Sequence, residues 1–300
     1  MLKLEEKIYK MFDKNTFTYG AEIEWGDIDR TLIVPEHLGK WEYAETDIVN
    51  LNPPYEYRAC DPLGLEPPMG GEINTKPTKT WQQQVDRVLE IHDLFVSHGN
   101  TPTTACVNHG HIHVFVPGLK EDVSALKRLI SYIKENQHDT IEACYGFYET
   151  KEMKSCEGAK MYLKLDGGRP MPDYMCDNII NLATDFEHFI KLHAAGKDGV
   201  SMGRPFRFAI NTYCMKHTGT IEFRCFRATT KRKELESQFQ FAEKFIDAAL
   251  NQGPSVREIL SESDYAFPPF IWNINEYLGW VQSKYPKERG EKKREFHDAA

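Results

Sequence analysis

Residues 220–227, TIEFRCFR, combine a carboxylate and a guanidinium with apolar side chains at the spacing of a β-strand. Because side chains alternate between the two faces of a strand, Glu222 and Arg224 point to one side together with Phe226. The opposite side is apolar and suits a protein core: Ile221, Phe223 and Cys225. Two opposite charges on such a strand indicate either a cross-strand ion pair on a solvated face or a site for a metal-bound polyphosphate.

Carboxylates also occupy one face of two further predicted strands. In residues 17–25, FTYGAEIEW, Glu22 and Glu24 are two positions apart, so both point to the same side. Glu72 lies on a short strand in residues 70–77, GGEINTKP, which ends at a proline. Neighbouring carboxylates repel each other unless a cation lies between them or water screens them. These residues are therefore either part of solvent-facing edges or ligands of a cation.

Histidines occupy one face of a fourth predicted strand, residues 103–117. His109, His111 and His113 share that face by alternation. Neutral imidazole is a common ligand of divalent metals, and two histidines at this spacing can reach one ion. They can equally divide between a metal and a phosphate or substrate oxygen. The alternative is a polar sheet face in water.

A fifth predicted strand, residues 204–215, precedes the TIEFR segment and places Arg207 and Asn211 on one face. Residues 217–219 then form the hairpin turn into the strand of Glu222. If all these strands share one antiparallel sheet, one face carries several carboxylates, two imidazoles and guanidinium groups. Such a surface requires cations, and magnesium commonly brings phosphates with it. Neither phosphate-binding glycine loop, GxxxxGK[ST] or GxGxxG, occurs in the sequence.

Amphipathic helices must cover the apolar face of this sheet. Helical periodicity predicts four of them, at residues 81–98, 121–137, 177–192 and 233–250. The predicted fold class is therefore α+β, with helices packed on one face of an antiparallel sheet. Two polar segments, residues 26–70 and residues 149–174, are predicted as irregular structure, and the second as a hairpin or a cover over the site.

Composition excludes several classes of protein. The chain has 300 residues, 41% of them hydrophobic, and a formal net charge of -8, so broad electrostatic binding to nucleic acid is not expected. No apolar run approaches 18 residues, so we expect no membrane span and no membrane partner. The seven cysteines include no CxxC pair, which favours reduced thiols in a cytoplasmic protein.

The order of these motifs resembles the amidoligase family, in the carboxylate–amine ligase superfamily with glutamine synthetase and glutamate–cysteine ligase. GxExE, GxExxTxP, HxHV and GTIEFRxF follow one another between about residues 17 and 250. One departure is His109, which stands where the family usually has a glycine. We expect a single catalytic domain over residues 1–300. The resemblance covers its core at about 17–250, and the sequence adds a helical extension at 251–285 and a charged tail at 286–300. It further implies a curved sheet with helices on its convex side, as in the catalytic core of glutamine synthetase.

The resemblance also implies an ATP- and Mg²⁺-dependent ligase that binds two or more metal ions, with Mn²⁺ as an alternative. The implied metal ligands are Glu22, Glu24, Glu72, His111 and Glu222. His111 and His113 would lie at the metal–ATP site, and Arg224 would contact the transferring phosphate. Arg207 and Asn211 would bind substrate or phosphate.

The expected reaction joins a carboxylate to an amine through an acyl phosphate, with small molecules or peptides as substrates. Direct condensation in water is uphill, so ATP must activate the acid. One alternative is a metal-dependent hydrolase that uses His109, His111 and His113 with an activated water. Another is a relative without catalytic activity that binds a ligand.

Overall fold

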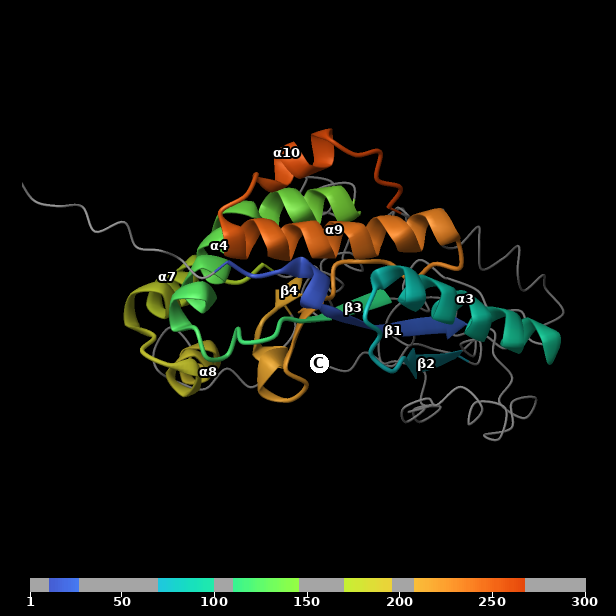
Figure 1. Ribbon diagram of the computed structural model, residues 1–300, viewed down its shortest axis with the longest axis horizontal. Helices are drawn as coiled ribbons and strands as arrows, with labels where there is room; N and C mark the ends of the chain where they lie inside the picture. Colours follow the sequence, from blue (N-terminus) through green and yellow to red (C-terminus); the bar gives the residue numbers. More distant parts are fainter. Residues whose placement is uncertain (1–10, 27–69, 100–109, 146–169, 196–207, 268–300) are drawn as a thin grey trace, which may run out of the picture.

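The computed structural model describes residues 11–26, 70–99, 110–145, 170–195 and 208–267. Its centre is a five-stranded antiparallel sheet in the order β2-β1-β3-β5-β4 (Figure 1). The strands are β1 (Thr18–Gly26), β2 (Gly70–Asn74), β3 (Gly110–Phe115), β4 (Ile210–Asn211) and β5 (Thr220–Phe223). The helices are α3 (Trp81–Ser97), α4 (Val123–Tyr145), α7 (Asp173–Leu182), α8 (Phe186–Ala194), α9 (Arg232–Asn251) and α10 (Val256–Ser261), with 3-10 turns η1 (Lys14–Thr16) and η3 (Tyr213–Lys216). This arrangement confirms the predicted α+β class and the antiparallel sheet.

The strand register aligns the polar positions of neighbouring strands. The paired positions are Glu24 with Glu72, Glu22 with His111, His113 with Glu222, and Glu222 with Asn211. Residues directly opposite each other in an antiparallel pair project to the same face of the sheet. Chain segments that are far apart in the sequence therefore contribute to one polar face.

The other face of the sheet is covered by helices (Figure 1). α9 packs against β3 and α3 packs against β1, while α4 lies beside α9. Phe223 of β5 meets Phe245 of α9 edge to face, with ring centroids 5.4 Å apart, and Trp25 of β1 meets Phe95 of α3 at 5.6 Å. These rings are fully buried, so the apolar face fixes which side of each strand points away from the helices.

Two predicted helices are confirmed with nearly the same bounds, α3 and α9. Thr80 caps α3 by accepting a hydrogen bond from the backbone N–H of Gln83 at 3.3 Å. Gly99 follows its last turn at φ 84°, a left-handed conformation that glycine adopts without strain. The apolar side chains at helical spacing on α9 are all buried: Leu235, Phe239, Ala242, Phe245, Ile246 and Ala249.

Two other helices differ from the prediction. α4 continues beyond Gln137 to Tyr145, because Ile141 and Cys144 extend its buried stripe. The single helix predicted at 177–192 is two helices, α7 and α8. Asp185 begins the second one by accepting a hydrogen bond from the backbone N–H of His188 at 2.8 Å, a local cap that helical periodicity does not reveal.

The strand predicted at 204–215 is also wrong beyond Asn211. β4 contains only Ile210–Asn211, because Asn211 Oδ1 accepts a hydrogen bond from the backbone N–H of Tyr213 at 3.1 Å and the chain turns into η3. The glycine turn before β5 is as predicted, with Gly219 at φ 82°. Several predictions lie outside the described residues: those for Arg207 and His109, residues 27–69 of the predicted loop, and residues 149–169 of the expected cover.

The face predicted for Phe226 is wrong as well. Regular pairing of β5 ends at Phe223, and the next residues leave the strict alternation of the ladder. Phe226 is buried, stacks on Phe223 at 6.0 Å and meets Phe241 of α9 at 6.2 Å. It therefore belongs to the helix-covered core and leaves the polar face to Glu222 and Arg224.

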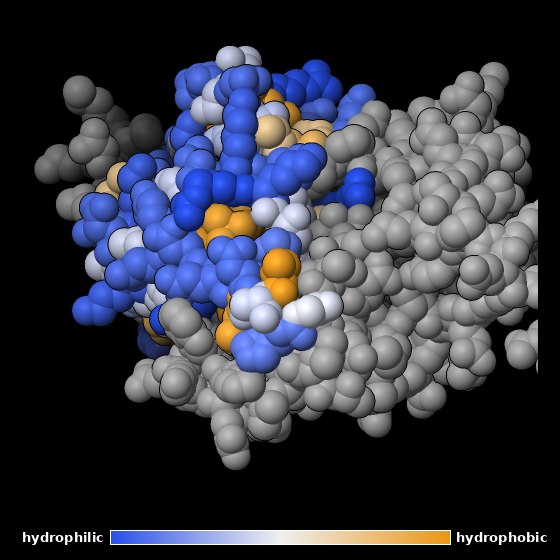
Figure 2. Space-filling view, turned by 90° about the vertical axis from the view of Figure 1, so that its right-hand side faces the viewer, coloured by the Kyte–Doolittle hydropathy of each residue, from blue (hydrophilic) through white to orange (hydrophobic). Residues whose placement is uncertain are grey.

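The surface of the described residues carries few large apolar side chains. Figure 2 shows one face on which hydrophilic atoms dominate and hydrophobic atoms form small separate groups. The exposed large hydrophobic residues belong to different parts of the fold: Met11, Val96, Phe115 and Leu182. Such scattered residues do not define a docking surface.

Candidate functional site

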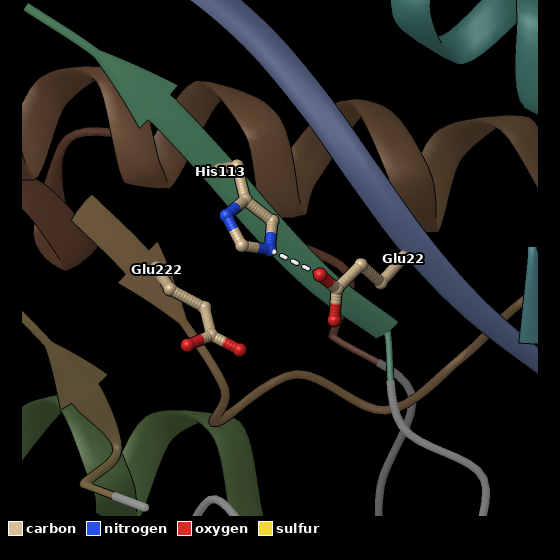
Figure 3. Close-up of side chains that lie close together, drawn as sticks. All are labelled: Glu22, His113 and Glu222. Atoms are coloured by element: carbon tan, nitrogen blue, oxygen red, sulfur yellow. Dashed lines mark ion pairs between the residues drawn. The ribbon is translucent and has the colours of Figure 1, made fainter. Parts of the chain in front are cut away.

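A compact polar cluster lies on the sheet face opposite the helices. Glu22 comes from β1, His113 from β3 and Glu222 from β5, and their side chains point to the same side of the sheet (Figure 3). Each offers one ligand atom, and these atoms lie within 4.8 Å of one another. His113 and Glu222 are buried, and Glu22 is half-buried. This spacing is that of side chains able to share one cation.

Glu22 connects the two histidines of β3. Its Oε2 lies 3.0 Å from Nδ1 of His111, and its Oε1 lies 3.0 Å from Nε2 of His113. Burial by itself would raise the pKa of Glu22, but its contacts with His111 and His113 outweigh burial and hold that pKa well below its usual range. Glu22 is therefore a carboxylate at all ordinary pH values.

Glu222 is held by donors from two sides. One oxygen accepts a hydrogen bond from Nδ2 of Asn211 at 2.6 Å, and the other accepts one from Nη1 of Arg224. Nδ1 of His111 lies 3.5 Å from the same carboxylate. Because the backbone N–H of Tyr213 bonds to Oδ1 of Asn211, the amide of Asn211 is oriented with its NH₂ group toward Glu222.

The imidazole of His113 lies between an acidic side and a hydroxyl side. Its Nε2 faces Glu22, and its Nδ1 is 2.9 Å from Oγ1 of Thr220. Burial would lower the pKa of His113, but contacts with Cys214 and Glu22 and the charge of Glu222 together raise it to about 10. Without another cation, an imidazolium thus supplies the positive charge between the two carboxylates.

A divalent cation fits the same position on chemical grounds. Two carboxylates and one imidazole form a mixed oxygen and nitrogen ligand set of the kind that binds Mg²⁺, Mn²⁺ or Zn²⁺. The cation would replace the proton on Nε2 of His113 and offset the charges of the two carboxylates. The residues present are therefore compatible with a metal ion.

The structure brings together most of the residues singled out in the sequence. Glu22, His111, His113, Asn211, Glu222 and Arg224 form one network. Glu24 and Glu72 pair with each other in the adjacent strands, although their side chains lie outside the described part of the chain. His113 belongs to the three-residue ligand group, whereas His111 contacts the carboxylates of that group through Nδ1.

Sequence reasoning missed Thr220 and Cys214. Thr220 precedes Glu222 by two positions, so alternation already placed it on the polar face. Cys214 approaches through η3, where Sγ lies 3.9 Å from Nδ1 of His113. No strand pattern predicts that approach, because η3 replaces the second half of the strand expected at 204–215.

Comparison with protein-family models, with curated proteins and with solved structures finds no match to this chain. Within the described residues, no helix combines the length and apolar composition needed to cross a membrane. The site and the sequence motifs therefore carry the functional argument.

Proposed function

We propose that this protein is an ATP-dependent carboxylate–amine ligase with a catalytic core like that of glutamine synthetase. The observation that carries the proposal is the grouping of Glu22, His113 and Glu222 within 4.8 Å, with Arg224 bonded to Glu222 at its side. A cation ligand set beside a guanidinium is the combination that binding and transfer of a phosphoryl group require. The motif order that resembles the amidoligase family supports the same activity.

In this proposal, Glu22, Glu222 and His113 hold a divalent cation, Mg²⁺ or Mn²⁺. Such an ion, when bound, neutralises the charge of the ATP phosphates. Glu24 and Glu72 extend the carboxylate row along β1 and β2 and are proposed ligands of a further ion, because their backbone positions pair directly. A row of ligands on one sheet face suits an extended polyphosphate.

The remaining polar residues orient this ligand set and the phosphate. Asn211 holds one oxygen of Glu222 in place. His111 contacts both carboxylates and can donate or accept a hydrogen bond next to the phosphates. Arg224 presents a planar guanidinium, which matches phosphate oxygens better than a point charge does. Arg207, outside the described residues, is a further proposed phosphate or substrate contact.

The proposed reaction has two steps. The substrate carboxylate attacks the γ-phosphate of ATP, which forms an acyl phosphate and releases ADP; the amine then displaces phosphate and leaves an amide. The protein accelerates both steps by holding the reactants together and by stabilising charge on the transferring phosphoryl group. Small-molecule or peptide acids and amines are the proposed substrates. ATP supply and the unbridged cysteines Cys144, Cys176, Cys214 and Cys225 support a cytoplasmic location.

Thermal unfolding in the presence of ligands tests this proposal. The melting temperature is measured with Mg²⁺ alone, with Mg²⁺ and a non-hydrolysable ATP analogue, and with Zn²⁺ alone. A ligand that binds only the folded state raises the melting temperature by mass action. We expect Mg²⁺ with the nucleotide to raise the melting temperature beyond its value with Mg²⁺ alone, and we expect this additional rise to be lost in Glu222→Gln. Glu236→Gln, the same change on the exposed side of α9, is the matched control.

A rise with Zn²⁺ alone, and no effect of the nucleotide, would contradict the ligase and favour a metal-dependent hydrolase built on the histidine strand. If the nucleotide binds, release of ADP is then measured with libraries of acids and amines. Turnover that requires both an acid and an amine identifies the substrate classes.

A further inference from the structure

A chain of hydroxyl groups leads away from His113 on the side opposite Glu22. Nδ1 of His113 is 2.9 Å from Oγ1 of Thr220, and that oxygen is 2.6 Å from Oγ1 of Thr218. Oγ1 of Thr218 is in turn 3.1 Å from the backbone carbonyl oxygen of Cys214. The chain therefore runs from β3 across the start of β5 to η3 and ends on a carbonyl group.

One direction of hydrogen bonding along this chain ends on the carbonyl group. A carbonyl oxygen can only accept, so the hydroxyl of Thr218 donates to Cys214. The oxygen of Thr218 then accepts the proton of the Thr220 hydroxyl, and the backbone N–H of Thr220 also points to it at 3.3 Å. The oxygen of Thr220 consequently accepts from His113, which requires a proton on Nδ1.

A metal ion on Nε2 of His113 requires this direction, because a ring that binds metal through Nε2 carries its proton on Nδ1, where Thr220 can accept it. With the proton held on Nδ1, the lone pair of the neutral ring lies on Nε2, the nitrogen 3.0 Å from Glu22. Nε2 therefore faces the carboxylates with which His113 forms the ligand group. The opposite tautomer would place a proton between the ring and a bound cation.

We propose that Thr220 is a positioning residue that, through Thr218 and the Cys214 carbonyl, holds His113 in the tautomer that offers Nε2 to a divalent cation. This inference rests on the proposed function only for the presence of the cation. A hydrogen bond to the second nitrogen of a metal-bound histidine orients the ring and increases its affinity for the metal. Thr220 thereby acts on the metal without touching it.

Direct measurement of metal binding tests the proposal without reference to catalysis. Mn²⁺ affinity is measured by titration calorimetry for the full-length wild type, Thr220→Val and Thr220→Ser. Valine has nearly the shape of threonine and suits a strand, so the fold is retained while the acceptor is lost. We expect Thr220→Val to weaken Mn²⁺ binding about 10- to 100-fold and Thr220→Ser to restore it.

A control variant and a spectroscopic readout separate positioning from packing. Thr140→Val makes the same change in α4, where the hydroxyl bonds the Asn136 carbonyl, and should leave Mn²⁺ affinity unchanged. Long-range ¹H–¹⁵N correlation spectra of the Zn²⁺-loaded wild type, labelled at histidine nitrogens, should show a proton on Nδ1 of His113. Thr220→Val should show a mixture of ring states.

The possible failures are distinguishable. If the wild type binds Mn²⁺ and Thr220→Val binds it equally well, or if the metal sits on Nδ1, the positioning role is overturned while the metal site stands. If the wild type binds none of Mn²⁺, Mg²⁺ and Zn²⁺, the proposed function loses its metal site and the role of Thr220 falls with it.

Discussion

Replacement of Glu222 by glutamine probes the centre of the site most directly. The substitution keeps the shape of the side chain but removes its charge. Glu222 accepts from Nδ2 of Asn211 at 2.6 Å and from Nη1 of Arg224, and both partners can only donate at those atoms. A glutamine offers one accepting oxygen and one NH₂ group, so one of the two donors must face another donor. Asn211 cannot turn over without losing its bond to the Tyr213 N–H.

The cost of this mismatch follows from burial. The side chain of Glu222 is 4% exposed and that of Arg224 is 15% exposed, so water screens the pair weakly. Removing one partner of such a buried pair costs about 3–5 kcal/mol of unfolding free energy, because the remaining charge keeps its desolvation cost and loses the opposite charge that offset it. Since glutamine retains one hydrogen bond, we expect Glu222→Gln to lose unfolding free energy at the lower end of this range, about 3 kcal/mol. A domain stable by about 5–15 kcal/mol remains folded after this loss.

Urea unfolding of the metal-free protein at pH 7, after treatment with a chelator, measures this effect. Glu222→Gln should lower the unfolding midpoint while the dependence of the free energy on urea concentration stays constant. Glu236→Gln is the matched control, because its partner Arg232 is 3.7 Å away and both side chains are at least one-third exposed. We expect this control variant to lose less than about 1 kcal/mol of unfolding free energy.

Repeating the measurement with Mn²⁺ separates stability from binding. The wild type should gain stability with Mn²⁺ concentration, whereas Glu222→Gln should gain little, because it lacks one of three ligands. A loss of unfolding free energy in Glu222→Gln no larger than that in Glu236→Gln would refute a buried and tightly held Glu222. That result would mean that Asn211 and Arg224 bind a solvated carboxylate and that the cluster is an ordinary polar face.

Three further predictions concern Arg224 of the site, the buried His193 and the start of β3. Arg224→Lys should lower ADP release about 100-fold in steady-state assays, because an ammonium group cannot reproduce a planar fork; near-normal turnover would make Arg224 purely structural. Burial lowers the pKa of His193 to about 3, so between pH 6.5 and 3 this histidine binds a proton in the unfolded chain but not in the folded one. The free energy of unfolding therefore falls by up to about 1.4 kcal/mol per pH unit on acidification. Unfolding of His193→Gln across this range should show a shallower loss than the wild type, and equal slopes would contradict the assignment. Gly110→Ala should destabilise by about 1–3 kcal/mol in urea unfolding, because its Cβ would lie 3.2 Å from Cα of Ala228 and 3.3 Å from the carbonyl oxygen of Arg227; an unchanged midpoint would show that this segment moves aside.

The face assignments are the part of the site that the sequence predicts best. Strand alternation alone placed Glu22, His111, His113 and Glu222 opposite the apolar side chains, and the register pairs these positions. Alternation works here because one face must be buried against helices, which leaves no choice for the other face. Alternation gave the wrong face for Phe226, because the hydrogen-bonded ladder of β5 has ended there and side chains no longer alternate.

Turns that depend on a single side-chain hydrogen bond are the part that the sequence does not predict. Asn211 ends β4 by bonding the Tyr213 N–H, and Asp185 divides one predicted helix into two. Both residues are polar side chains within otherwise suitable patterns, and their effect depends on backbone geometry rather than on periodicity. For the same reason the sequence does not predict the approach of Cys214 to His113, because η3 follows from the turn at Asn211.

The register, rather than any one motif, determines whether the ligand group exists. A slip of two residues between β1 and β3 would keep every side chain on its face and every apolar residue in the core. It would nevertheless move Glu22 about 7 Å along the sheet, farther than the 4.8 Å that contains the ligand atoms. Alternation of hydrophobic residues therefore cannot by itself specify the site.

Contacts at the ends of the strands prevent such a slip of the register. Thr75 bonds both the N–H and the carbonyl of Ala21 through its hydroxyl, which fixes the end of β2 on β1. Gly110 donates its N–H to the carbonyl of Phe226 at 3.0 Å, and the absence of a side chain lets β3 begin this close to the segment that follows β5. These positions lie outside the ligand group, yet they set the distance between Glu22, His113 and Glu222. Substitutions there should change metal affinity as well as stability, which links the packing of the sheet to the proposed chemistry on its polar face.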